Sequence, residues 1–437
     1  MQSVSTLYER LKADLSDCGT AAGVMVSQKL SPFESGFDVQ PPTYSTGEDG
    51  RGGRQTPTRH FAVRRIPEKG MALTVLMDSI PSQANRLEEI MRNRVKDLDL
   101  PVVGVRVGVT GYLITQYDAP HRIYDGYFKF SKLDGQPFFA SPIGQEILSA
   151  DTFYATPLYR WSPNTLLFGG WASHADETVM QIAGSEGRFQ RAQAKLERAM
   201  EATIIGVVSS LPERELDPIR GPEIIKALKQ LFTAGRTQSR YDPLNASAPK
   251  GKEPSKEKLS QLGLGHILPT IEEDSGYVSV EEILYQAVLK FASLRKLYFP
   301  PGSGGQVPYA HERDVAGRVV LASLGLYLLA LYLSQGTLKL RSRATLIPRD
   351  GAARAEYLAG PGQREDFVLD PGLMKELYEC AKEDAQKYDL TFTKECLLLE
   401  LDEKELKEKT NFVFKVPVAP SYIYEICPQL AGGTPRE

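Results

Sequence analysis

An apolar run at residues 71–77, MALTVLM, is bounded by Gly70 and Asp78. A continuous run of this length is typical of a strand buried on both faces. Ser79 and Ser82 follow as candidate helix caps, and apolar residues then recur at helical spacing from residue 87 to residue 95. The pattern predicts a strand, a tight loop and a helix.

The same patterns predict further elements along the chain. Helices are expected over residues 1–20, 188–200, 222–232, 280–297, 314–334 and 373–387. Strands are expected over 202–209 and 337–347, a strand or hairpin over 102–115, and a charged helix or strand over 397–409. Residues 120–170 are expected to alternate aromatic-rich strand-like pieces with turns at Asp134-Gly135 and Ser162-Pro163-Asn164. This order favours an α+β fold of the ferredoxin-like kind over a doubly wound sheet.

The longest apolar run covers residues 319–333, and Arg318 precedes it. Fifteen residues fall short of the ~18–20 that span a bilayer. We therefore expect a buried core helix and no membrane partner.

Three regions are expected. Residues 1–58 form an N-terminal helix and loop, residues 59–348 form the main α+β unit, and residues 349–437 form an acidic C-terminal extension. Residues 234–265 are rich in Lys, Ser and Pro and are expected to be a flexible insertion within the main unit.

Composition places this 437-residue chain among globular proteins, with 42% hydrophobic and 24% charged residues and a net charge of −3. The average hides local positive charge, since residues 51–65 contain five arginines and no acid. Such a patch is what a polyanion site needs. Four widely spaced cysteines without a CxxC pair argue against a disulfide framework or zinc ribbon, and the N-terminus does not resemble a signal peptide. We expect a cytoplasmic protein.

The start of the helix after residue 79 is the first candidate site. A helix N-terminus offers unpaired N–H groups to a phosphate, and Ser82, Gln83, Asn85 and Arg86 would add side-chain donors. A capped helix with a solvated first turn fits the same residues.

Other candidates are weaker. His121, Arg122 and Asp125 suit either acid–base chemistry or an internal ion pair, and Ser173 beside His174 lacks the context of a nucleophile elbow. Further cations lie at Arg188, Arg191, Arg240, Arg341 and Arg343. The sequence contains no Walker A, HExxH or GxGxxG motif, and its histidines share no metal-ligand spacing, so no cofactor or metal is expected.

Five segments resemble one protein family, in the family's order. They are MDSIPSQANRLEE (77–89), PHRIYDGYF (120–128), LYRWSPNTLLFGGWASH (158–174), SRYDPLN (239–245) and LKLRSRATLIP (338–348). The family is the RAMP-superfamily backbone subunit of the type I-G (formerly I-U) CRISPR Cascade effector complex.

The resemblance implies an RRM-like palm with inserted fingers and a thumb. Residues 104–170 and residues 234–265 are both candidates for the thumb. It implies a non-enzymatic subunit that stacks with other copies along a CRISPR guide RNA and presents the spacer to target DNA, beside a large subunit and a foot or processing subunit. The residues expected to bind RNA are Arg64, Arg65, Ser79, Ser82, Gln83, Asn85, Arg86, His121, Arg122, Trp171, Ser173, His174, Arg188, Arg191, Arg240, Arg341 and Arg343.

Two alternatives remain open at this point. One is a metal-independent ribonuclease of the same superfamily that uses His121 or His174. The other is a scaffolding protein that binds no nucleic acid.

Overall fold

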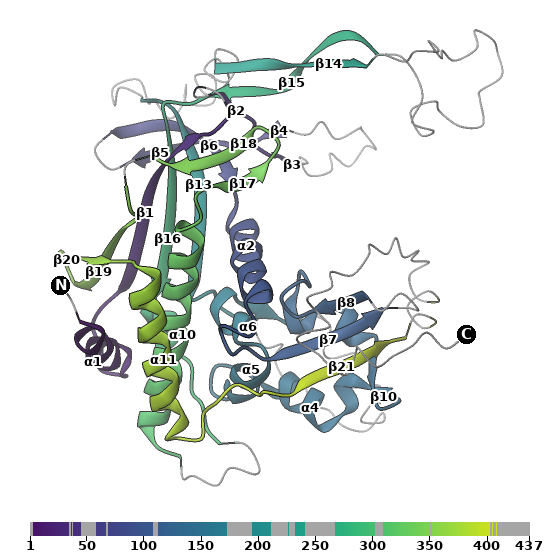
Figure 1. Cartoon of the computed structure of the whole chain (residues 1–437), viewed down its shortest axis with the longest axis vertical. Helices are drawn as coiled ribbons and strands as arrows, with labels where there is room; N and C mark the ends of the chain where they lie inside the picture. Colours follow the sequence, from purple (N-terminus) through teal and green to yellow (C-terminus); the bar gives the residue numbers. More distant parts are fainter. Residues whose placement is uncertain are drawn as a thin grey trace.

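The computed structural model describes residues 3–34, 36, 38–44, 58–66, 69–107, 112–172, 195–210, 226, 232–240, 267–301, 309–349, 351–402, 404 and 408, without the side chains of residues 112, 235–240 and 267–275. Within this part the chain is a mixed α+β protein with several sheets (Figure 1).

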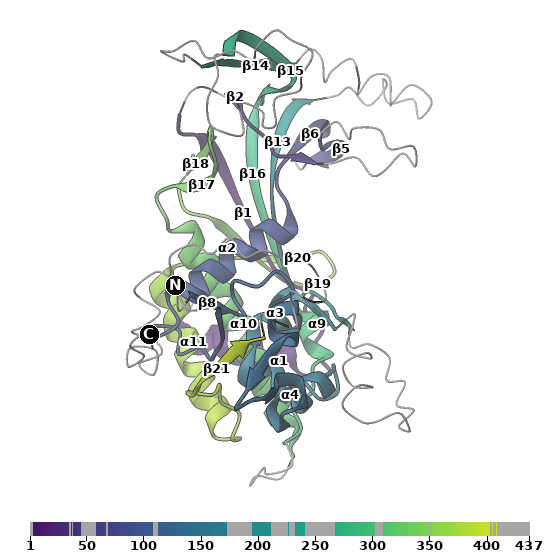
Figure 2. The ribbon, with the colours of Figure 1, turned by 90° about the vertical axis from the view of Figure 1, so that its right-hand side faces the viewer.

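The main sheet is antiparallel throughout its described pairs. Its strand order is β17 (Leu338–Arg341), β18 (Ala344–Pro348), β1 (Gly23–Pro32), β16 (Glu282–Lys290), β13 (Met200–Ser210), β6 (Gly70–Asp78) and β5 (Phe61–Ile66), and the hairpin of β19 (Arg354–Gly360) and β20 (Gln363–Val368) pairs with β1 beside this row. Figure 2 shows the long strands running from the lower part of the molecule to its upper end.

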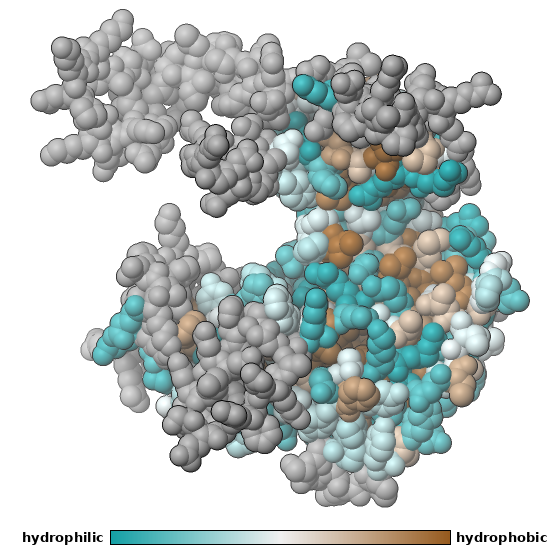
Figure 3. All heavy atoms as spheres, turned by 180° about the vertical axis from the view of Figure 1, so that it is seen from behind, coloured by the Kyte–Doolittle hydropathy of each residue, from teal (hydrophilic) through white to brown (hydrophobic). Residues whose placement is uncertain are grey.

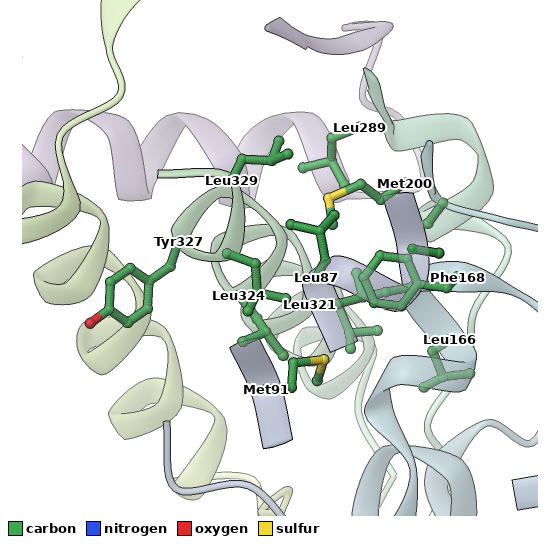
Figure 4. Close-up of a cluster of buried hydrophobic side chains, with 14 of the residues drawn as sticks. Leu87, Met91, Leu166, Phe168, Met200, Leu289, Leu321, Leu324, Tyr327 and Leu329 are labelled. Carbon is green, nitrogen blue, oxygen red and sulfur yellow. The ribbon is translucent and has the colours of Figure 1, made fainter. Parts of the chain in front are cut away.

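Helices cover this sheet and enclose the core. α10 (His311–Leu333) contacts α1 (Val4–Leu15), α2 (Ile80–Asn93), α9 (Phe291–Arg295) and α11 (Pro371–Gln386). Figure 4 shows Leu87 and Met91 of α2 and Leu321 and Leu324 of α10 meeting Met200 of β13 in one cluster. Burial of such side chains away from water is the main stabilising contribution.

α10 is long and apolar enough to cross a membrane, but its most apolar window is 100% buried inside the protein. Its position confirms the predicted core helix. Two arginines of this helix are also buried. Arg318 donates to the Leu297 and Leu15 carbonyls and to Asp17, and Arg313 donates to the Phe299 and Tyr388 carbonyls. These bonds attach segments near both ends of the chain to α10.

A second sheet lies beside α5 and α6 and contains the C-terminal part of the described chain. Its order is β10 (Gln136–Pro137), β9 (Ser131–Leu133), β21 (Cys396–Leu401), β7 (Val102–Val107) and β8 (Tyr112–Thr115), and β21 runs parallel to β7. Around it lie η1 (Arg122–Tyr124), α3 (Gly126–Lys129), η2 (Phe138–Ala140), α4 (Pro142–Ser149), α5 (Thr156–Trp161) and α6 (Pro163–Phe168). The described part of the acidic extension is thus packed within the chain.

A third sheet joins β14 (Thr233–Arg240), β15 (Ile267–Ser279) and β2 (Asp38–Val39). In Figure 1 the β14–β15 hairpin lies across the upper end of the main sheet and extends to one side. Two short pairs complete the described strands: β3 (Thr43–Tyr44) with β4 (Thr58–Arg59), and β11 (Gly170–Trp171) with β12 (Lys195–Leu196).

Several predicted elements are confirmed. The structure contains the strand and helix of residues 71–95, the hairpin at 102–115, the strand at 202–209, and the helices at the N-terminus, at 314–334 and at 373–387. The predicted turn at Asp134-Gly135 also forms, with both residues at positive φ (50° and 82°), as a tight hairpin between β9 and β10 requires.

Other predictions are wrong. Residues 282–290 form a central strand, because β1 and β13 pair with both edges of β16 and bury Ile283, Tyr285, Ala287 and Leu289 on alternate positions. Residues 120–170 are mostly helical. Of the predicted helix at 188–200, residues 188–194 lie outside the described residues, and residues 195–196 and 200 belong to strands. Residues 337–347 form a hairpin in place of one strand. Of the expected insertion at 234–265, residues 234–240 belong to β14 and residues 241–265 lie outside the described residues, so its flexibility stays a prediction. The predicted helix at 222–232 lies almost wholly outside the described residues.

Candidate nucleic-acid interface

Asp78, the last residue of β6, is the centre of a polar cluster and is only 1% exposed. Its Oδ1 accepts hydrogen bonds from Ser82 Oγ (2.9 Å) and Arg341 Nη2 (3.3 Å). Its Oδ2 accepts from Gln83 Nε2 (2.6 Å) and Arg86 Nε (2.8 Å). We call Asp78, Ser82, Gln83, Arg86 and Arg341 the Asp78 network.

Local sequence explains how α2 supplies three members of this network. The Ser79 side chain caps the helix by accepting from the Ser82 backbone N–H, and Pro81 occupies the first turn. Side chains of a helix lean towards its N-terminus. Ser82, Gln83 and Arg86 therefore lean back towards the residue that ends β6.

The network also attaches the β17–β18 hairpin to the β6–α2 junction. Arg86 donates from Nη1 to the Lys339 carbonyl (3.0 Å) and from Nη2 to the Leu340 carbonyl (3.1 Å). In return, Arg341 donates to the Met77 carbonyl (2.9 Å) as well as to Asp78. Burial lowers the pKa of Arg341. Burial also acts to lower the pKa of Arg86, but the hydrogen bond and the charge of Asp78, together with Tyr332 and Glu89, raise it overall. Both arginine side chains stay cationic at neutral pH because arginine titrates so far above it.

The bonds of the Asp78 network use side-chain donors that were expected to meet a phosphate at the start of α2, and in the structure these donors meet the Asp78 carboxylate of the chain itself. Gln83 is 0% exposed, and its amide donates to Asp78 and to the Tyr332 hydroxyl. The structure thus shows a role in positioning the hairpin for Ser82, Gln83, Arg86 and Arg341. RNA contact by these residues stays a prediction. Ser79 is half-buried as the cap, and Asn85 is exposed on the outer side of α2.

Arg122 is likewise an internal residue. Its guanidinium donates to both carboxylate oxygens of Glu88 (2.7 and 3.1 Å) and to the Gly169 carbonyl (3.1 Å), and Asn164 donates to the same carboxylate. Burial raises the pKa of Glu88, although Arg122 opposes that effect. Arg122 is thus in an internal ion pair as expected, but its partner is Glu88 and not Asp125. His121 beside Arg122 is exposed, and its backbone N–H donates to Asp125.

The remaining expected residues fall into two groups. Arg64 is half-buried and Arg65 exposed on the edge strand β5, Arg343 is exposed in the β17–β18 turn, and Trp171 is 55% exposed on β11. Ser173, His174, Arg188 and Arg191 lie outside the described residues, and only the backbone of Arg240 is described. Figure 3, from the opposite side, shows hydrophobic residues on the described surface among hydrophilic ones.

The described residues contain no group of three His, Cys, Asp or Glu that could hold a metal ion. Cys396 is disulfide-bonded, whereas Cys18 and Cys380 are free. This leaves room for a single bridge, so the four cysteines do not form a disulfide framework.

In the sequence, Asp78 marks only the end of a strand, and its role as the centre of a network is not evident. The signal that could have found it is an acid that closes a buried strand, followed at helical spacing by Ser82, Gln83 and Arg86. The fourth partner of Asp78, Arg341, is more than 250 residues away in the sequence, and no local pattern indicates it.

Comparison with known families bears on the part of the chain that contains β1, β6, α2 and β13. No curated protein matches the chain. Residues 24–210 match the family described as CRISPR-associated protein GSU0053 (Cas_GSU0053). Over this segment, which includes Asp78 and the α2 members of its network, the chain is thus similar to CRISPR-associated proteins, and the match links it to CRISPR defence.

Proposed function

We propose that the chain is a non-enzymatic backbone subunit of a type I-G Cascade complex in the cytoplasm. Copies of it bind side by side along a CRISPR guide RNA, together with the other Cascade subunits, and present the spacer for pairing with target DNA. The observation that carries the proposal is the family match of residues 24–210. The sequence resemblance in residues 239–245 and 338–348 extends it beyond the matched segment.

Strand order supports an RRM-like palm. Four neighbours in the main sheet stand in the order β18, β1, β16, β13. Along the chain, β1 comes first, β13 second, β16 third and β18 fourth. α2 lies between β1 and β13, and α10 lies between β16 and β18. This is the split β-α-β arrangement of a β-α-β-β-α-β unit, in which β5 and β6 are additions at one edge.

The β14–β15 hairpin is our candidate for the thumb. It is a long two-stranded arm, and its base is attached to the rest of the described chain where Val278 and Ser279 pair with β2 and where Arg343 lies over Tyr277. An arm of this kind can reach a nucleic acid that lies on the neighbouring surface. Residues 104–170 pack into the second sheet and its helices, which suits a fingers domain better.

Direct binding of single-stranded RNA tests the proposal. We expect labelled guide RNA to bind the full chain with an affinity that falls steeply as salt rises, because phosphate contacts release counterions. The bound RNA should stay intact on long incubation. A cleaved product that disappears in His121→Ala would support the ribonuclease alternative, and an absence of RNA binding would support the scaffolding alternative.

A further inference from the structure

The turn between β17 and β18 places one arginine in an unusual backbone conformation. Arg343 has a φ of +53°, a backbone conformation that residues other than Gly and Asn seldom adopt. Its carbonyl accepts a hydrogen bond from the Gln40 backbone N–H (3.2 Å), which holds the turn against the segment after β2. The Asp78 network holds β17, the strand that leads into this turn, through Arg341 and Arg86. The turn is therefore fixed from two sides.

The Arg343 side chain lies on an aromatic ring of a different sheet. Its guanidinium carbon is 4.6 Å from the centre of the Tyr277 ring, within the range of a cation–π contact. Tyr277 belongs to β15, and the next residue, Val278, is 0% exposed and pairs with both Thr233 and Val39. The ring is thus held by a three-stranded sheet and limits the motion of the arginine above it.

Arg343 differs from the other arginines near the hairpin in the partners of its guanidinium N–H groups. Among the described residues its guanidinium has no hydrogen-bond or ion-pair partner, whereas those of Arg86 and Arg341 are bound to carbonyls and to Asp78. The nearby Glu34 carboxylate is engaged by the Thr345 hydroxyl (2.5 Å) and backbone N–H (3.2 Å). An exposed guanidinium that is stacked on one face keeps its N–H edge for a planar or tetrahedral anion.

We propose that Arg343 binds a phosphate of single-stranded RNA and that Tyr277 is its positioning residue. The inference rests on the proposed function and deepens it, since it joins the palm hairpin and the β14–β15 arm in one RNA contact. Because the contact is with the backbone, it carries no base preference.

Binding of a labelled single-stranded RNA to the full chain, titrated at several salt concentrations, tests both roles. Arg343→Ala should weaken binding about tenfold for all sequences alike and reduce the salt slope by about 0.7, the value for one phosphate contact on a single strand. Arg343→Lys should keep the slope but lose affinity. Tyr277→Leu should lose affinity with little change in slope, and Tyr277→Phe, which keeps the ring, should bind like the wild type.

Arg364→Ala is the matched control. Arg364 is an exposed arginine on β20. The β19–β20 hairpin pairs with the Gly23 end of β1, whereas the β17–β18 hairpin that carries Arg343 pairs with the Pro32 end. Removal of the Arg364 side chain should leave affinity and slope unchanged. If the wild type binds RNA and Arg343→Ala binds with the same affinity and slope, the inference is wrong while the proposed function stands. If the wild type binds no RNA at any salt concentration, both are wrong.

Discussion

At the scale of single residues, the Asp78 carboxylate decides how the β17–β18 hairpin is held. It is buried against two guanidinium groups, an amide and a hydroxyl, so its charge is compensated where water is excluded. A buried ion pair adds little net stability compared with apolar packing, but removing one partner is costly because the other charge stays buried. The network is therefore best understood as a device that fixes one geometry.

Asp78→Ala tests this role. We expect it to lower the free energy of unfolding by about 3–5 kcal/mol, because Arg86 and Arg341 would keep their positive charge without its partner. The measurement is a urea unfolding curve. Glu89→Ala on the same helix is the control, since Glu89 is exposed and its contact with Arg92 is on the surface, where a change below about 1 kcal/mol is expected. Equal effects of the two substitutions would contradict a special role for Asp78.

At the scale of elements, predictions succeeded where local chemistry alone defines the structure. The strand at 70–78 and α2 carry their own signals, an apolar run and a Ser-Pro cap. β16 failed because its apolar positions suit a helix as well as a strand, and only pairing with β1 and β13 decides between them. In the candidate site, the cluster of polar residues on α2 could be predicted. Its internal use could not, because Arg341 comes from a distant hairpin.

β21 gives a test of the C-terminal extension. This strand joins β9 to β7, and Leu399 in it is 0% exposed. Leu399→Ala should lower stability by about 2–5 kcal/mol through the cavity it leaves. It should also speed amide hydrogen exchange in β7 and β9. Glu400→Gln, on an exposed side chain of the same strand, should do neither. Wild-type exchange in Leu399→Ala would mean that β21 is not part of the second sheet.

The contact between α1 and α11 gives a pH-dependent test. Burial acts to raise the pKa of Asp384, but the Tyr8 hydroxyl (2.5 Å), Lys387 and Lys12 outweigh it and lower the pKa below the usual 3.8. The folded state then binds this proton less tightly than the unfolded state. The stability that the Asp384 carboxylate contributes is therefore complete above its usual pKa and is lost as the pH falls through the lowered pKa of the folded state.

Asp384→Asn should thus remove part of the loss of stability on acidification below about pH 3.8, as measured by urea midpoints at pH 6 and pH 3.5. Glu383→Gln changes the same charge on an exposed neighbour in α11 and is the control. If Asp384→Asn and the wild type lose stability in parallel, the α1–α11 contact is not coupled to this proton.

At the scale of the whole molecule, charge is distributed unevenly in a protein with a net charge of −3. Acids outnumber bases 15 to 9 from residue 366 onward, and residues 51–65 carry five arginines. Many of the described arginines also serve the fold, as Arg86, Arg122, Arg313 and Arg318 do. Under the proposed function, the RNA-binding surface is therefore local, and we expect its affinity to depend on a few placed cations such as Arg343.

The most direct test of the proposed function is to purify the protein from cells that express a matching guide RNA and to measure the mass and RNA content of the product. We predict a large assembly of several copies on intact RNA of one length. A monomer free of RNA, obtained even when the other Cascade subunits are present, would contradict the account.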